Sequence, residues 1–272
     1  MTAARWLIAA AILLGYAFLL APLIIVLVAS FAGGQTTYVV FPPTSFSFEW
    51  YWRLPSEYLR PTLVSIAIAI GAGTISSVLG ILAAFGIVRG WLPGRSVLKA
   101  YFNAPMQIPF VVTGIVFLQF YYLLYGIFGA RLVGSFWGLL GVHVFITLPY
   151  VIGTVGAVLE RFDPSVEEAA LTLGASPWST FRRVTLPLIK PGVLAGVLYA
   201  FVVSFGDVPA TMFVVSANTT TLPVQLFHAI EFDYNPALLA LCSLVVILSL
   251  SLIFAIQWLL GFDFIVRGRA GG

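Results

Sequence analysis

Charged residues are scarce in this chain of 272 residues. Asp, Glu, Lys and Arg make up only 8% of the sequence, whereas a soluble domain carries about 25%. Hydrophobic residues make up 61%, and they gather in long runs. The composition excludes a soluble globular protein and predicts an all-α membrane protein, because the strands of a membrane barrel would alternate polar and apolar residues. The net charge of +3 is no sign of nucleic-acid binding, since the basic residues flank the apolar runs.

Cysteine and phosphate-binding motifs are almost absent. The single cysteine, Cys242, lies inside an apolar run and excludes an intrachain disulfide. A phosphate-binding loop places Lys directly after Gly, but Lys99 follows Leu98 and Lys190 follows Ile189. The sequence therefore predicts a chain with no ATP site of its own and no bound cofactor or metal. It also predicts that the chain is not an enzyme.

Six apolar stretches reach the length of about 20 residues that a transmembrane helix needs. These predicted spans are residues 6–31, 61–88, 100–127, 135–159, 192–215 and 236–261. The first is too long for the apolar region of a signal peptide, and no small-residue cleavage site clearly follows it. We therefore predict one transmembrane domain over residues 1–272.

The basic residues indicate how these spans are oriented. If the N-terminus is cytoplasmic, ten of the 13 basic residues fall on the inside. The outside keeps only Arg53, Arg60 and Arg131. Because cytoplasmic loops carry an excess of Lys and Arg, both termini and the loop 160–191 are expected in the cytoplasm.

The loop 160–191 is polar, and from Asp163 onward it reads DPSVEEAALTLGASPWSTFRRVTLPLIKP. Asp163 and Ser176, each followed by proline, predict the N-termini of two short helices. Gly174 predicts a left-handed turn between them. Pro187 predicts the end of the second helix.

Seven positions of this loop fit one spaced pattern. They are Glu168, Ala169, Ala170, Gly174, Val184, Leu186 and Pro187. The pattern resembles the EAA loop of binding-protein-dependent ABC importer permeases, which reads E-A-A, three residues, G, nine residues, I-x-L-P. Val184 is the one departure, where the family has Ile. The resemblance implies the type I ABC importer permease fold, with six transmembrane helices, and a loop that docks on a cytoplasmic ATPase. The ATPase-coupling residues that it implies are Glu167, Glu168, Ala169, Ala170, Gly174, Leu186 and Pro187.

The resemblance also implies partners and a class of solute. The stretch TTLPVQL at residues 220–226 resembles the spermidine/putrescine-type branch, which implies a polyamine or related cation; iron, opine and other small-solute branches share parts of it. The implied partners are a second homologous permease subunit, an ATPase dimer that holds ATP and Mg, an extracytoplasmic solute-binding protein and membrane lipid. The binding protein would meet residues 42–60 or 216–235. The implied location is the bacterial inner membrane, with several passes.

Four polar residues are candidates for the solute pathway. Asp207 is the one acidic residue expected inside a span, where a carboxylate usually faces a cavity or a partner. Asn103 and Gln107 lie four residues apart and are expected on one helical face of the third span. Tyr122 is either a solute contact or part of an interfacial belt. His143 is expected to hydrogen-bond to a neighbouring helix.

Two other functional classes remain open from the sequence. A stand-alone secondary transporter would carry ionisable residues in several spans, and it leaves the EAA-like loop unexplained. A scaffold subunit without transport would not need Asp207, Asn103 and Gln107 in its spans.

Overall fold

The computed structural model describes residues 2–34, 41–90, 93–232 and 236–260. Asp233 and the basic residues Arg267 and Arg269 lie outside the described residues. The helices are α1 (Thr2–Ala29), α2 (Glu49–Trp52), α3 (Leu59–Arg89), α4 (Arg95–Asn103), α5 (Phe110–Phe128), α6 (Phe136–Arg161), α7 (Ser165–Thr172), α8 (Pro177–Thr180), α9 (Leu186–Phe205), α10 (Leu222–Phe232) and α11 (Ala237–Leu260). Within these ranges there is no strand, which confirms the all-α class.

Shorter turns connect some of the helices. Three are 3-10 turns, namely η1 (Ser56–Tyr58), η2 (Ala104–Gln107) and η4 (Thr211–Phe213). The fourth, η3 (Phe181–Thr185), is a turn of π-helix between α8 and α9. The chain divides into two compact units, one of residues 1–59 with 225–251 and one of residues 60–224 with 252–272.

Within the described part of the chain, five helical stretches are long and apolar enough to cross a membrane. They are Arg5–Ala29, Ser56–Arg89, Phe110–Phe128, Phe136–Arg161 and Pro177–Phe205. Helix α11 also contains an apolar stretch, Ala237–Leu252. The count of six spans and the cytoplasmic side of both termini stay predictions.

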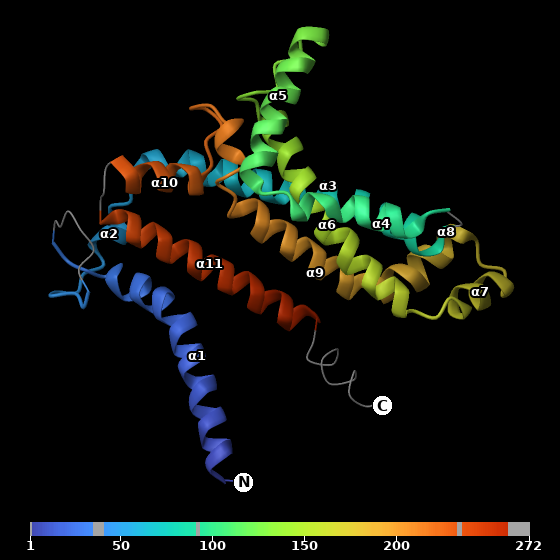
Figure 1. Cartoon of the computed structure of the whole chain (residues 1–272), viewed down its shortest axis with the longest axis horizontal. Coiled ribbons are helices and arrows are strands. Elements are labelled where there is room, and N and C mark those ends of the chain that lie inside the picture. The colour runs from blue at the N-terminus through green and yellow to red at the C-terminus, as the bar shows by residue number, and fades with distance from the viewer. Residues whose placement is uncertain (1, 35–40, 91–92, 233–235, 261–272) are drawn as a thin grey trace. The chain divides into compact units, whose positions relative to one another are not determined.

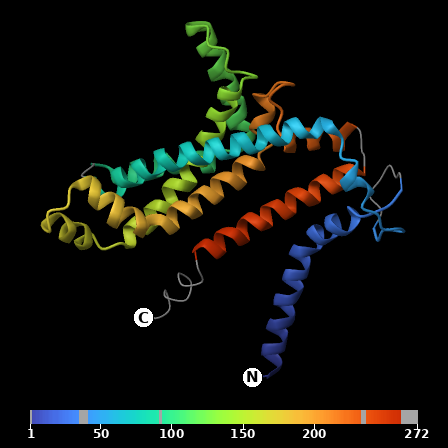
Figure 2. The same ribbon diagram turned by 180° about the vertical axis from the view of Figure 1, so that it is seen from behind.

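The larger unit is built on α3, α6 and α9, which run side by side (Figures 1 and 2). On α9, Gly192, Gly196 and Ala200 recur every four residues, the small-residue spacing that lets membrane helices approach closely. A Cβ on Gly196 would lie 2.7 Å from Oγ1 of Thr154 and 3.0 Å from Cα of Val151 on α6. The backbones of α6 and α9 are therefore in near contact.

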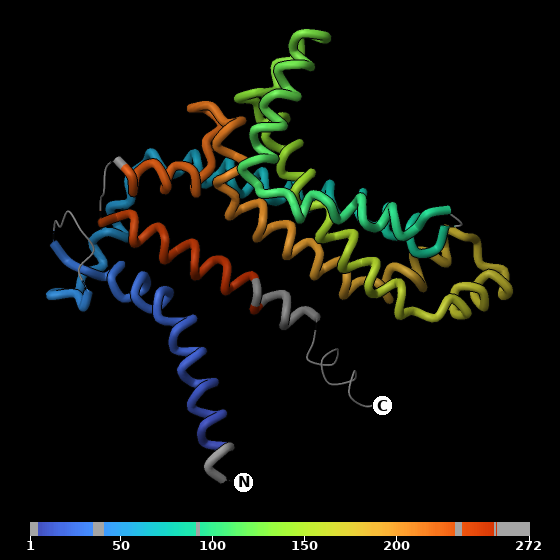
Figure 3. The backbone as a smooth tube through the Cα atoms, in the orientation of Figure 1, coloured from blue at the N-terminus to red at the C-terminus, as the bar shows by residue number. Residues whose placement is uncertain are grey.

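The third predicted span, residues 100–127, is not one helix. Helix α4 ends at Asn103, η2 follows, and α5 begins at Phe110 in a new direction (Figure 3). Proline removes a hydrogen-bond donor and favours an extended residue before it. Ile108, directly before Pro109, is extended, with ψ of 127°. The expectation that Asn103 and Gln107 share one helical face is therefore wrong, because they belong to different elements.

The fifth predicted span, residues 192–215, is also shifted. Helix α9 starts earlier, at Leu186, and ends at Phe205. Pro209 has no N–H to donate and would clash with the carbonyl of Phe205, four residues before it, so the helix ends at Phe205 and the chain then forms η4. Asp207 therefore lies just beyond the helix rather than within it.

The smaller unit holds α1 and the aromatic segment after it. The Tyr51 hydroxyl lies 2.6 Å from Oγ of Ser30 and 2.6 Å from Oγ of Ser243. The rings of Phe31, Phe48 and Tyr51 pack together, with Phe31 and Tyr51 stacked at 5.2 Å between centroids. One tyrosine thus ties the end of α1 to α11 within this unit.

Candidate functional site

The first helix of the polar loop begins and ends as its residues dictate. The Ser165 N–H donates to Oδ1 of Asp163 at 2.9 Å, just ahead of α7. This bond, aided by the nearby positive charge of Arg89, holds the pKa of the Asp163 carboxyl below its usual range. At the other end Gly174 has φ of +87°, as predicted, and its N–H donates to the Leu171 carbonyl. The Ala175 N–H donates back to Ala170, so a Schellman motif closes α7.

The second helix of the loop starts where predicted but does not end at Pro187. Oγ of Ser176 accepts the N–H of Ser179, and Pro177 occupies the first turn of α8. The helix then widens into η3, where the Leu186 N–H bonds to the Phe181 carbonyl, five residues back. Because α9 starts anew at Leu186, Pro187 falls in a first turn, where its missing N–H costs nothing. Residues 163–187, named the elbow below, therefore run directly into the α9 span.

The elbow presents an exposed apolar surface. Val166, Leu171, Leu173 and Trp178 are all exposed, and Leu173 shows 89% of its surface. Trp178 stacks on Phe181 at 5.6 Å between ring centroids. Exposed apolar patches rimmed by charge are typical of protein–protein contact surfaces.

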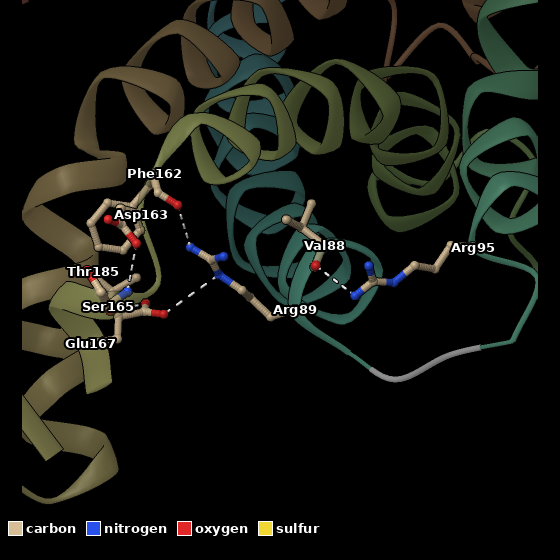
Figure 4. Close-up of polar contacts among 8 residues, drawn as sticks. All are labelled: Val88, Arg89, Arg95, Phe162, Asp163, Ser165, Glu167 and Thr185. Atoms are coloured by element: carbon tan, nitrogen blue, oxygen red, sulfur yellow. Dashed lines mark hydrogen bonds and ion pairs between the residues drawn. The ribbon is translucent and has the colours of Figure 1, made fainter. Parts of the chain in front are cut away.

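The two adjacent glutamates of α7 have different surroundings. Glu168 is exposed, and Ala169 beside it is exposed as well. Glu167 points inward, where Oε1 accepts the Thr185 hydroxyl at 2.6 Å and Oε2 lies 3.6 Å from Nε of Arg89 (Figure 4). The two neighbouring carboxylates therefore point in different directions, Glu168 outward and Glu167 inward.

Arg89 joins the end of α3 to the start of the elbow. Its Nη2 donates to the Phe162 carbonyl at 3.1 Å, and its guanidinium carbon lies 5.5 Å from the centre of the Phe162 ring. The sequence predicts only an orienting role for Arg89, as one of the ten basic residues on the inside, and no role for Thr185. Nothing in the local pattern could reveal this contact, because 78 residues separate Arg89 from Glu167 along the chain.

Asp207 is buried, with 3% of its surface exposed. Thr211 donates to Oδ2 twice, from its N–H at 2.8 Å and from its hydroxyl at 2.7 Å. These bonds offset part of the cost of removing a carboxylate from water. The other oxygen, Oδ1, is buried and has no hydrogen-bond partner among the described residues.

Thr211 connects Asp207 to the buried histidine of α6. His143 Nε2 lies 3.0 Å from Oγ1 of Thr211, and Nδ1 lies 2.8 Å from Oγ of Ser204 on α9. The expectation that His143 bonds to a neighbouring helix is confirmed. No sequence pattern indicated its link to Asp207, because the intermediary Thr211 lies beyond the break in the fifth span.

The other pathway candidates are dispersed. Asn103 lines a small hollow of about 70 Å³ with Lys99 and Glu160, which form an ion pair at 2.7 Å. Tyr122 is 57% exposed and lines a hollow of about 300 Å³, which also includes Arg131. Neither hollow includes Asp207 or Gln107.

A larger hollow of about 430 Å³ lies along α5, lined by Thr113 and by apolar residues that include Val112 and Phe117. No charged residue contributes to its lining. It therefore lacks the polar groups that would fix a charged solute in place.

Residues 76–262 match the family described as "Binding-protein-dependent transport system inner membrane component". The chain is 32% identical over 237 residues to the putrescine transport system permease protein PotI of Escherichia coli K12, covering 86% of this chain and 83% of the relative. It is 32% identical over 244 residues to the spermidine/putrescine transport system permease protein PotC of Haemophilus influenzae, covering 89% and 91%. It is also 31% identical over 233 residues to the sulfate transport system permease protein CysT of Salmonella typhimurium, covering 81% and 84%.

Two solved structures share the fold at low sequence identity. A bacterial ABC transporter for import of the acidic polysaccharide alginate aligns with a TM-score of 0.65 and 17% identity, covering 100% of this chain and 98% of that one. The MetNI methionine ABC transporter in an inward-facing form aligns with a TM-score of 0.61 and 20% identity, covering 82% and 99%.

Proposed function

The chain belongs to the family of binding-protein-dependent transport system inner membrane components, and on this premise we propose that it carries a polyamine or related cationic compound. It is a permease component of an ABC importer and has the permease fold of such importers. It is not an enzyme, since ATP is hydrolysed on a separate subunit. It resides in the inner membrane and works with an ATPase and a solute-binding protein.

The identity to the putrescine and spermidine/putrescine permeases carries the proposal about the solute. Asp207 supports this proposal. It is the single acidic residue in residues 110–128, 136–159 and 191–207, which cover α5 and most of α6 and α9, and these ranges contain no Lys or Arg. A carboxylate in low dielectric favours a nearby cation and disfavours an anion. The sulfate permease relative makes sulfate the alternative solute to be tested.

The elbow is proposed to dock on the ATPase, which would hold ATP and Mg. Its exposed apolar side chains would enter a groove of the ATPase, and the exposed Glu168 would meet a basic group at the rim. Ala169 and Ala170 are small and let the two surfaces approach closely. Gly174 sets the angle between α7 and α8, and Leu186 with Pro187 begins the span that follows.

The solute pathway is proposed to form between this chain and a second, homologous permease, with an ATPase dimer bound on the cytoplasmic side. The dispersed positions of Asn103, Gln107, Tyr122 and Asp207 suit a pathway whose other wall belongs to another subunit. The spans would alternate between inward-open and outward-open arrangements, as alternating access requires.

Reconstitution tests the solute directly. The permease is purified with its ATPase, second permease and binding protein, and placed in proteoliposomes containing ATP. We expect uptake of radiolabelled putrescine that excess spermidine suppresses and excess sulfate does not. A matched complex whose ATPase lacks its phosphate-binding lysine should show no uptake. Sulfate uptake without putrescine uptake would reject the polyamine proposal.

A further inference from the structure

Glu167 and Glu168 are adjacent on α7, yet only one of them is available to a partner. Glu168 is exposed to solvent. The side chain of Glu167 is 19% exposed, and both of its oxygens face groups of the same chain. The negative charge of Glu167 is therefore directed into the permease and away from any docking surface.

Three elements meet at Glu167 (Figure 4). Glu167 belongs to α7, Arg89 is the last residue of α3, and Thr185 is the last residue of η3, directly before α9. Thr185 is buried, so its hydrogen bond to Glu167 is shielded from competition by water. Movement of α7 relative to α9 would break this bond, and movement relative to α3 would change the distance between Arg89 and Glu167.

The contact between Arg89 and Glu167 is incomplete. At 3.6 Å, Nε of Arg89 and Oε2 of Glu167 form an ion pair that is too long for a hydrogen bond. Nε is buried and has no hydrogen-bond partner among the described residues. A buried donor without a partner is unfavourable, so a small shift of α7 toward α3 would be stabilising. The geometry therefore links the position of the elbow to the end of α3.

We propose that Arg89, Glu167 and Thr185 form a coupling clamp that fixes α7 to the cytoplasmic ends of α3 and α9. Glu167 is then a positioning residue, which passes movement of the elbow to two spans, whereas Glu168 meets the ATPase. The inference rests on the proposed function in one respect, that the elbow docks on an ATPase. It adds Arg89 and Thr185, neither of which belongs to the EAA-like pattern, to the residues that couple hydrolysis to transport.

The test measures how strongly the solute-loaded binding protein stimulates ATP hydrolysis by the whole complex in proteoliposomes. Glu167→Gln removes the charge that faces Arg89, and Thr185→Val removes the hydroxyl while keeping a β-branched shape. We expect both variants to co-purify with the ATPase and to keep the basal rate of hydrolysis. Stimulation should fall about tenfold, as expected for the loss of a hydrogen bond to a charged group.

Two control variants sharpen the result. Thr185→Ser keeps the hydroxyl and should keep the stimulation. Glu160→Gln removes the carboxylate of the exposed ion pair between Glu160 and Lys99, on the same predicted side of the membrane as the clamp. It should also keep the stimulation, because exposed ion pairs contribute little to stability.

Wild-type stimulation in both Glu167→Gln and Thr185→Val would overturn the clamp. Failure of both variants to co-purify with the ATPase would also overturn it, since Glu167 would then act in docking or folding. The measurement does not depend on which solute is carried. A wild-type complex that is stimulated but imports sulfate would reject the polyamine proposal and leave the result on the clamp valid.

Discussion

His143 donates a hydrogen bond from Nε2 to Oγ1 of Thr211, 3.0 Å away. The single hydroxyl proton of Thr211 goes to Asp207, so its oxygen can only accept from the imidazole. In a neutral ring Nδ1 is then an acceptor, and the Ser204 hydroxyl donates to it at 2.8 Å. The four side chains thus form one directed chain of hydrogen bonds from α9 through α6 to Asp207.

The first prediction concerns the stability contributed by this chain. His143→Leu should lower the melting temperature in detergent, because it leaves the buried Ser204 hydroxyl without its acceptor and removes the donor to Thr211, which keeps its bond to Asp207. Each unsatisfied buried group costs about 1–3 kcal/mol. His143→Gln can keep one of the two bonds and should lose less. Equal melting temperatures for the His143→Leu and His143→Gln variants would show that the hydrogen bonds contribute nothing.

The second prediction separates the charge of Asp207 from its shape. In Asp207→Asn the amide oxygen can take the place of Oδ2 and accept both hydrogen bonds from Thr211, so these contacts remain while the charge is lost. Uptake of putrescine should fall about tenfold, equivalent to about 1.4 kcal/mol, with unchanged yield of the assembled complex. If the Asp207→Asn variant takes up putrescine at the same initial rate as wild type, the role of Asp207 is structural only.

The third prediction addresses the contact between α6 and α9. Gly196→Ala places a Cβ 2.7 Å from Oγ1 of Thr154, so the helices must separate. Overpacking of this kind costs about 1–3 kcal/mol, which thermal unfolding would detect. Gly153→Ala is the matched control on α6, because a Cβ there meets nothing within 4 Å. The packing argument fails if both alanines have the same effect.

The fourth prediction concerns the turn of the elbow. Gly174→Ala forces an L-residue to φ of +87°, which costs about 1–2 kcal/mol and favours a different turn. Co-purification with the ATPase should weaken while insertion into the membrane stays normal, and Gly174→Pro should abolish ATP-driven uptake. Gly86→Ala, at an open helical position, serves as the control. Full uptake by the Gly174→Pro variant would rule out a coupling role for this turn.

The fifth prediction tests the outward carboxylate. Glu168→Arg reverses the charge on the exposed side of α7 without touching the contacts of Glu167. The fraction of ATPase retained by the immobilised permease should drop, because Arg would repel the basic group that Glu168 is proposed to meet, and added salt should weaken this repulsion. Glu57→Arg makes the same reversal in the segment expected outside the membrane and should retain the ATPase fully. Similar retention by the two variants would argue against docking through Glu168.

The sequence predicted the elements that local chemistry decides. Gly174 takes the left-handed turn and Ser176 caps its helix, because both depend on neighbours within a few residues. The predicted helix end at Pro187 is wrong, because the wide turn η3 ahead of it places this proline in the first turn of α9. Hydropathy predicts Asp207 inside a helix, because it does not register the break at Gly206.

Contacts between distant parts of the chain were beyond the reach of sequence patterns. Glu167 was assigned to coupling only by its place beside the EAA motif, and nothing local showed that it faces Arg89 and Thr185. The spacing of Asn103 and Gln107 predicts a shared face only within one helix, but Asn103 ends α4 and Gln107 ends the 3-10 turn η2. Spacing rules hold only while one helix continues.

The π turn η3 also sets the rotational phase between the elbow and the span. The buried positions Thr180, Thr185 and Ile189 are spaced by five and then four residues, and buried small residues of α9 continue the row. An uninterrupted α-helix would turn Thr185 by about 100° away from that row, given 3.6 residues per turn. The wide turn accommodates one extra residue and therefore keeps the buried faces of the elbow and of the α9 span aligned. Deletion of one residue from either helix would rotate these two buried faces relative to each other.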